Sequence, residues 1–161
     1  MRLWLGVVAG IALSACGRVA APNLDTILAD KPAPTLADYG LFEDAAGRVP
    51  VSDLVPYDLS NPLYSDHAEK LRYVYVPDGE SAVYRETDVI AFPIGTVLVK
   101  TFAYDDDFLE TRLLIHKADG WEAIPYVWND AQTEAVYAPV GKRIEIEAGR
   151  ATPDAPAFTY A

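Results

Sequence analysis

Apolar and polar residues alternate along much of the chain with the period of β-strands. Three consecutive runs, at 94–104, 108–117 and 121–128, are rich in β-branched and aromatic residues. They are separated by aspartates at 105–107 and by the turn sequence at 118–120, which ends in glycine. Such residues are typical of tight connections between antiparallel strands. The pattern predicts a three-stranded meander at the centre of the domain.

Shorter strand-like runs surround this meander and are separated by proline, glycine and aspartate. They lie at 71–76, 82–86, 89–92, 133–138 and 142–147, and a further strand begins at 158–160. Single helical turns are predicted after Thr35, which has Asp38 at the third position and Gly40 as a stop, and after Asp66, at 67–70. A weak apolar run at 24–29 is compatible with one further turn. The pattern predicts an all-β fold, an antiparallel β-sandwich or partly open barrel with one or two short helical turns.

The turns also predict how side chains are divided between the two faces of the meander. If both connections are three-residue turns, the opposed pairs are Phe102 with Glu110, Lys100 with Arg112, Arg112 with Tyr126, and Glu110 with Trp128. One face is then apolar core, made of Val97, Val99, Leu109, Leu113, Ile115, Ala123 and Val127. A slip of one residue in either hairpin would exchange the faces.

The opposite face mixes charge with large aromatic rings. Its predicted members are Leu98, Lys100, Phe102, Glu110, Arg112, Leu114, Tyr126 and Trp128. A solvated face usually carries fewer aromatic residues, and a buried face fewer charges. Two interpretations remain: a binding face built from Lys100, Glu110, Arg112, Tyr126 and Trp128, or an ion-paired packing layer beneath the N-terminal segment. The composition favours the packing layer.

The N-terminus has the form of a signal peptide over residues 1–15. Arg2 precedes an apolar run at 3–13 that is too short to span a bilayer, and Leu-Ser-Ala-Cys at 13–16 closes it. This tetrapeptide resembles the lipobox of bacterial lipoproteins, which implies cleavage before Cys16 and lipid on its thiol and amine. Cys16 is the only cysteine, so modification would leave no free thiol in an exported protein. An ordinary secretory peptide with a cysteine near its cleavage site is the alternative.

The rest of the chain divides by composition. Residues 16–34 are small and proline-containing and are predicted to be the lipidated cysteine and a flexible tether; residues 35–147 form the β domain, and residues 148–161 a C-terminal loop. The sequence ends within a strand-like run, so we expect it to be the N-terminal part of a longer protein. Gly17 stands where enteric lipoproteins retained at the inner membrane have Asp, and this resemblance implies the outer membrane, with the domain on the periplasmic side.

Charge limits the partners. The formal net charge is −11 for 161 residues, and removal of 1–15, which contain only Arg2 as a charged residue, changes it to −12. A strongly acidic domain is a poor ligand for nucleic acid and for anionic lipid surfaces. A protein partner is therefore the expectation, besides the membrane reached through lipid on Cys16.

The sequence lacks the residue patterns of familiar catalytic and cofactor-binding motifs. Ser65, Asp66 and His67 are adjacent, whereas the members of a hydrolase triad converge from separate elements, so a turn is expected there. His67 and His116 are the only histidines, and the aspartates at 105–107 lack the spacing of a calcium loop. No glycine-rich phosphate loop and no Cys-x-x-Cys-His haem motif is present. We expect neither a metal nor a cofactor in this chain.

Several segments together resemble an uncharacterised bacterial envelope family. They are Asp-Tyr-Gly-Leu-Phe at 38–42, Tyr-Asp-Leu-Ser-Asn-Pro-Leu-Tyr-Ser-Asp at 57–66, Glu-Lys at 69–70 with Arg72, Phe-Pro-Ile-Gly-Thr-Val-Leu-Val-Lys-Thr-Phe at 92–102, Leu-Glu-Thr-Arg-Leu at 109–113 and Tyr-Val-Trp-Asn at 126–129. The resemblance covers 36–146. Members of that family are described as lipoproteins or di-haem c-type cytochromes. It implies haem beyond the end of this sequence, in a longer parent protein, and a redox setting.

Three functions follow from these observations. The first is a lipid-anchored, non-catalytic periplasmic β module that positions or docks a cytochrome c-like redox partner or domain. The second is a glycan-binding module that stacks sugars on Tyr126, Trp128 and Tyr137, with polar contacts from the charged residues named above. The third is an envelope enzyme, or its accessory domain, with Glu110 as acid or base.

Overall fold

The computed structural model describes residues 21–160, so the predicted signal peptide and Cys16 lie outside the described residues. The elements within this range are α1 (Leu24–Ile27), the 3₁₀ helix η1 (Leu36–Tyr39), β1 (Leu54–Pro56), β2 (Glu69–Tyr75), β3 (Val97–Tyr104), β4 (Asp107–Lys117), β5 (Gly120–Trp128), β6 (Ala135–Tyr137), β7 (Ile144–Ile146) and β8 (Phe158–Tyr160). None of the helices in this part of the chain is long and apolar enough to cross a membrane.

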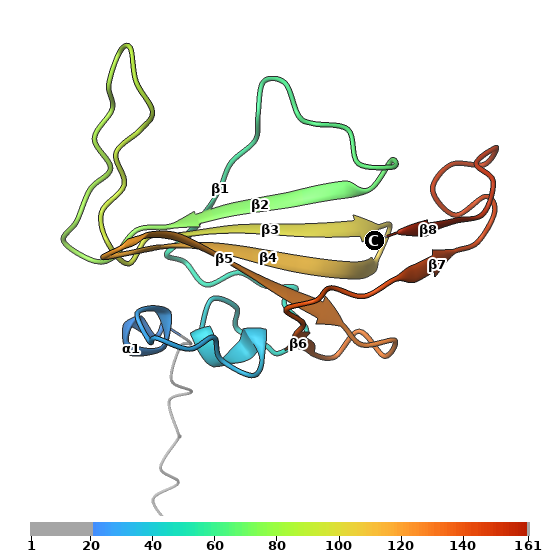
Figure 1. Ribbon diagram of the computed structural model, residues 1–161, viewed down its shortest axis with the longest axis horizontal. Coiled ribbons are helices and arrows are strands. Elements are labelled where there is room, and N and C mark those ends of the chain that lie inside the picture. The colour runs from blue at the N-terminus through green and yellow to red at the C-terminus, as the bar shows by residue number, and fades with distance from the viewer. Residues whose placement is uncertain (1–20, 161) are drawn as a thin grey trace, which may run out of the picture.

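The strands form two antiparallel sheets (Figure 1). Strands β1 to β6 make one sheet in sequence order, and β7 pairs with β8 in a second. The end strands β1 and β6 do not pair, so the larger sheet is open. The prediction of an all-β fold with a central meander of β3, β4 and β5 is confirmed, and the arrangement is consistent with a sandwich.

The first central hairpin has the predicted register, although its turn is not the three-residue turn on which the prediction rested. Its turn contains two residues, Asp105 and Asp106, because Tyr104 pairs with Asp107. A bulge at Leu109 then adds one residue to β4, since Ala103 pairs with Phe108 and Phe102 with Glu110. The extra residue restores the pairing that a three-residue turn would give.

The second hairpin also has a two-residue turn, 118–119, but no bulge follows it. Arg112 therefore lies opposite Pro125 and Glu110 opposite Val127, rather than Tyr126 and Trp128 as predicted. This shift of one residue places every side chain of β5 on the face opposite to the predicted one. The predicted core members Ala123, Val127 and Leu109 lie on the face opposite Val99 and Leu113, Leu109 because of the bulge.

One face of the sheet, here the inner face, is covered by residues 21–51 (Figure 1). Its buried cluster includes Ile27, Leu36, Tyr39, Leu41, Val51, Val97, Val99, Leu113, Ile115, Ile124, Tyr126 and Trp128. The prediction of a tether over 16–34 is wrong for the described part, since α1 packs against the sheet and Ile27 is fully buried. Asn23 caps α1 by accepting a hydrogen bond from the Thr26 N–H.

The other face, the outer face, is covered only at its ends. At one end Phe102, Tyr104 and Leu109 pack under the β7–β8 hairpin, and β8 confirms the strand predicted to begin at 158–160. At the other end Trp121 stacks on His116 with ring centroids 4.6 Å apart. The region between these ends is the part of the sheet that the rest of the described chain leaves open.

Local predictions near the helices and loops had mixed outcomes. The Thr35 capping box and the left-handed Gly40 stop are confirmed around η1. The helical turn predicted at 67–70 is wrong, because Asp66 and His67 have positive φ angles and β2 begins at Glu69. The strands predicted at 82–86 and 89–92 reduce to a single bridge between Val83 and Ala91. Strand β1 was not predicted.

Candidate functional site

Three cationic side chains lie abreast across the open part of the outer face. Arg72 on β2 pairs in register with Lys100 on β3, and Lys100 pairs with Arg112 on β4. Neighbouring strands are about 4.8 Å apart, and like charges directly opposite each other destabilise a sheet. This cationic row of Arg72, Lys100 and Arg112 is unexpected in a protein with a net charge of −11.

Arg72 is held by the loop that follows β1. Its side chain donates to Asp58 Oδ1 and to the Lys70 carbonyl oxygen, both at 3.2 Å. The residue is only 8% exposed, whereas the Asp58 side chain is 85% exposed. Because water solvates Asp58 so fully, this ion pair neutralises Arg72 only weakly.

Arg112 is paired more firmly, by Glu110 on the same strand. Its Nε and Nη2 donate to the two Glu110 carboxylate oxygens, each at 2.8 Å, and this bidentate hydrogen bonding raises the pKa of Arg112. Tyr160 on β8 donates to Glu110 Oε2 at 3.3 Å. Burial, with the nearby Glu110 charge, raises the pKa of Tyr160 well above its ordinary value, so the hydroxyl keeps its proton.

Lys100 has no such partner. Within residues 21–160 its ammonium forms neither an ion pair nor a hydrogen bond, and its Nζ lies 4.9 Å from the centroid of the Phe102 ring. Burial lowers the pKa of Lys100, and the charges of Arg112 and Arg72 lower it further. The middle of the cationic row therefore carries a charge that the described chain does not neutralise.

An apolar row runs beside the cationic row. Val74, Leu98 and Leu114 pair across the same three strands, two residues along from the cations, and all three side chains are half-buried. Residues two apart on a strand share a face. The open band, as we name these six residues, combines a charged strip and an apolar strip on the outer face; Arg112 is exposed, Arg72 is buried and the other four are half-buried.

Hollows lie on either side of the open band. One, of about 370 Å³, lies between residues 56–58 and residues 70–73. The other, of about 380 Å³, is lined by Glu110, Arg112, Pro125, Pro139 and Gly141 among others. The band is thus the ridge between two shallow depressions and is accessible from both.

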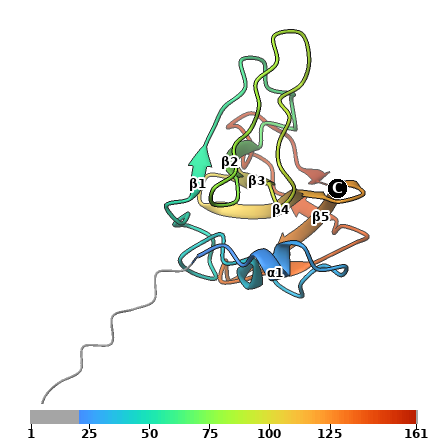
Figure 2. The same cartoon turned by 90° about the vertical axis from the view of Figure 1, so that its left-hand side faces the viewer.

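Two long loops project on the side of the sheet away from α1, as Figures 1 and 2 show. They are residues 57–67 and 78–94. Their side chains include exposed apolar groups such as Leu63, Tyr84 (77% exposed) and Val89 (79% exposed). Both loops therefore present large apolar side chains to solvent.

The structure brings together only part of the predicted binding face. Lys100, Glu110 and Arg112 lie together as expected, whereas Tyr126 and Trp128 are on the inner face and are 0% and 3% exposed. Tyr126 donates instead to the Ala33 carbonyl oxygen, at 2.9 Å. Two of the three aromatic rings proposed to stack sugars are therefore inaccessible, and the glycan hypothesis fails on that placement.

Arg72 is the site residue that the sequence reasoning missed. The alternation of side chains at 71–76, which includes Arg72 and Val74, correctly predicted strand β2. What the sequence did not give was the pairing of β2 with β3, which places Arg72 beside Lys100. A pairing between strands separated by 21 residues of loop leaves no local signal in composition.

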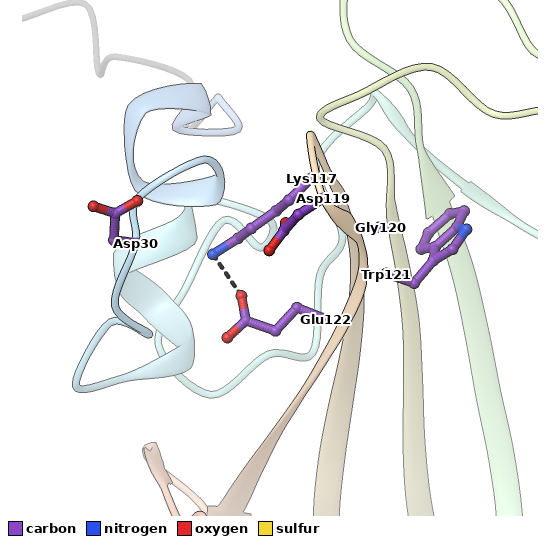
Figure 3. A pocket seen from close by; sticks show the side chains of 6 residues that line it. All are labelled: Asp30, Lys117, Asp119, Gly120, Trp121 and Glu122. Atoms are coloured by element: carbon purple, nitrogen blue, oxygen red, sulfur yellow. Dashed lines mark ion pairs between the residues drawn. The ribbon is translucent and has the colours of Figure 1, made fainter.

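A hollow of about 360 Å³ near the β4–β5 turn contains an ion pair between two of the residues that line it (Figure 3). Lys117 Nζ lies 2.5 Å from Glu122 Oε2 and donates to the Ala29 carbonyl oxygen at the same distance. Figure 3 shows Trp121 pointing away from these groups. The contact ties the N-terminal segment to the sheet, which is a structural role.

The remaining candidates do not form sites. Ser65, Asp66 and His67 lie in a turn in which the Ala68 N–H donates to the Ser65 carbonyl oxygen. Among residues 21–160 no three histidine, cysteine or acidic side chains converge as metal ligands would. Comparison of the chain with known protein families, curated proteins and solved structures finds no match.

Proposed function

We propose that this protein is a lipid-anchored, non-catalytic module of the bacterial envelope that docks a cytochrome c-like redox partner on the periplasmic side. The observation that carries the docking role is the open band, a cationic and apolar surface left uncovered in an otherwise acidic domain. Surfaces of this mixed character recognise partners through charge complementarity around an apolar contact.

Glu110 supports a binding role better than a catalytic one. Both of its carboxylate oxygens are engaged by Arg112, and one also accepts from Tyr160. A general acid or base needs a free oxygen directed at the substrate proton. Here the carboxylate holds Arg112 in place within the cationic row.

The redox nature of the partner rests on the family resemblance of 36–146, and the membrane anchor on the lipobox that ends at Cys16. Neither the redox partner nor the membrane anchor is inferred from the geometry of the sheet. They supply the setting in which the open band acts.

A photo-crosslinking experiment tests this proposal. A benzoylphenylalanine replaces Ala123, an exposed residue that pairs with Leu114 beside the open band, in the full chain produced in its own bacterium. Irradiation is expected to give an adduct that stains for covalently bound haem on a denaturing gel. The same residue placed at Leu28, which is exposed in the N-terminal segment on the inner-face side, is the matched control.

The result that contradicts the proposal is equally specific. Adducts that form at position 123 but never stain for haem would remove the redox partner. Equal adduct formation from positions 123 and 28 would remove the open band as the docking surface.

A further inference from the structure

The cationic row is incompletely neutralised at one defined point. Four cations, Lys70, Arg72, Lys100 and Arg112, lie on the outer face of β2 to β4, and the carboxylates of Asp58 and Glu110 are the two that pair with them. Each of these carboxylates is bound to an arginine at the edge of the group. Among residues 21–160, Lys70 and Lys100 therefore form no ion pair, and Lys100 is the one that lies between the arginines.

We propose that Lys100, flanked by Arg72 and Arg112, is a carboxylate-binding site that receives an acidic side chain from an extended segment of the docked protein partner. The inference rests on the proposed docking function and specifies its chemistry. An incoming carboxylate would pair with the Lys100 ammonium between two arginines and would supply the negative charge that is missing there.

The apolar row identifies the source of the carboxylate as a protein segment. Val74, Leu98 and Leu114 each lie two residues from the cation on the same strand, a separation of about 6.7 Å. Alternate side chains on one side of an extended segment have the same separation. An acidic residue and an apolar residue two positions apart therefore match the two rows, whereas a free inorganic anion would leave the apolar row uncovered.

The charge of the rest of the domain adds selectivity. With a net charge of −11, most of the surface repels an acidic segment, and the open band is where this repulsion reverses. The partner segment is thus directed to one location. The lowered pKa of Lys100 is consistent with a half-buried ammonium among like charges, and a bound carboxylate would raise it again.

Fluorescence anisotropy with synthetic peptides tests the site on the full-length chain. The probe is a labelled peptide of three Glu-Thr-Leu-Thr repeats, and its control has Gln in place of every Glu. Lys100→Met is expected to weaken binding of the Glu peptide by at least about tenfold, or about 1.4 kcal/mol. Lys100→Arg is expected to retain binding. Lys31→Met, which removes an exposed charge from the inner-face side, is expected to change it by less than about twofold.

Three results overturn the site. The Glu and Gln peptides bind equally, no binding of the Glu peptide is measurable, or Lys31→Met weakens binding as much as Lys100→Met. A further arm adds sodium phosphate or sodium acetate at an ionic strength matched with sodium chloride. Displacement beyond that seen with chloride would show a site for small free anions rather than for a protein segment.

The failures of the two proposals are distinguishable. If crosslinked adducts lack haem but peptide binding depends on Lys100, the carboxylate site stands and the redox partner does not. If haem-containing adducts form as well with Lys100→Met as without it, docking stands and the carboxylate site does not.

Discussion

The charge of Lys100 is unfavourable for folding but is required for the proposed binding of a carboxylate. Its ammonium lies between Arg72 and Arg112, is half-buried, and has no carboxylate of its own within the described chain. Like charges at this spacing and partial burial both disfavour the charged form. The charge of Lys100 therefore lowers the stability of the fold, as is common for residues that serve binding rather than folding.

Replacement of Lys100 by Met, which keeps the apolar stem, is expected to raise the free energy of unfolding at pH 7 by up to about 1 kcal/mol. The pKa of Lys100 is lowered on folding, so its unfavourable contribution is complete below the folded pKa. It disappears as the pH rises towards the unfolded value, because the folded state then loses its proton first. Urea unfolding at pH 7 and above pH 10 measures this difference, with Lys31→Met as control. Destabilisation by Lys100→Met at pH 7 would contradict it.

Among the elements, the β3–β4 hairpin depends on the side chain of Gln132, whose amide bonds to the β4 backbone as a neighbouring strand would. Gln132 accepts from the Phe108 N–H at 2.7 Å and donates to the Phe108 carbonyl oxygen at 3.0 Å, beyond the end of β5. Arg48 also donates to the Gln132 amide oxygen, at 3.2 Å. The amide of Gln132 thus supplies a rung of backbone pairing beside the bulge, and its positive φ of 56° is the strained conformation that allows it.

Gln132→Ala is expected to lower the free energy of unfolding by about 2 to 3 kcal/mol, because the Phe108 amide loses its partners and the strained backbone remains. Gln132→Gly should lose about 1 kcal/mol less, since glycine adopts a positive φ freely. Chemical denaturation of both variants checks this. An alanine variant as stable as the original protein would mean that the side-chain amide contributes nothing, because alanine keeps the strained backbone.

The same hairpin shows how far the sequence leads. The composition of 94–128 was sufficient for the three central strands, whereas the predicted pairing of Lys100 with Arg112 was met only because a bulge compensates for a two-residue turn. The position of Tyr126 was not predictable in this way, because both turns contain two residues and only one is followed by a bulge. A bulge depends on packing around Leu109 and on the Gln132 contact, which arise from residues far apart in the chain.

The N-terminal segment illustrates a second limit. Small residues and prolines at 16–34 are typical of linkers, yet Ile27 and Ala33 are core members. Tertiary contacts decide this, above all the Tyr126 hydroxyl that donates to Ala33. Burial of a single isoleucine and one backbone carbonyl is too weak a pattern to distinguish a packed segment from a tether in sequence.

For the whole molecule, the proposed membrane anchor depends on a single residue, Cys16. Cys16→Ser is expected to move the protein from the membrane fraction to the soluble fraction, because each lipid CH₂ contributes about 0.8 kcal/mol to membrane binding and serine carries no lipid. Intact mass spectrometry of the membrane form should show the added lipid. Ser14→Ala, which keeps a small residue before the cleavage site, is the control. A mature exported protein with a free Cys16 thiol would contradict the anchor.

The packing of residues 21–51 under the sheet fixes which way an anchored domain would stand. Cys16 and Ala21 are five residues apart, so fully extended chain between them reaches at most about 18 Å. The inner-face cover would then rest close to the bilayer surface, and Lys100 would look outward from it. With a connection this short, the proposed anchor would hold the open band facing away from the lipid, where the proposed acidic partner would bind without contacting the membrane.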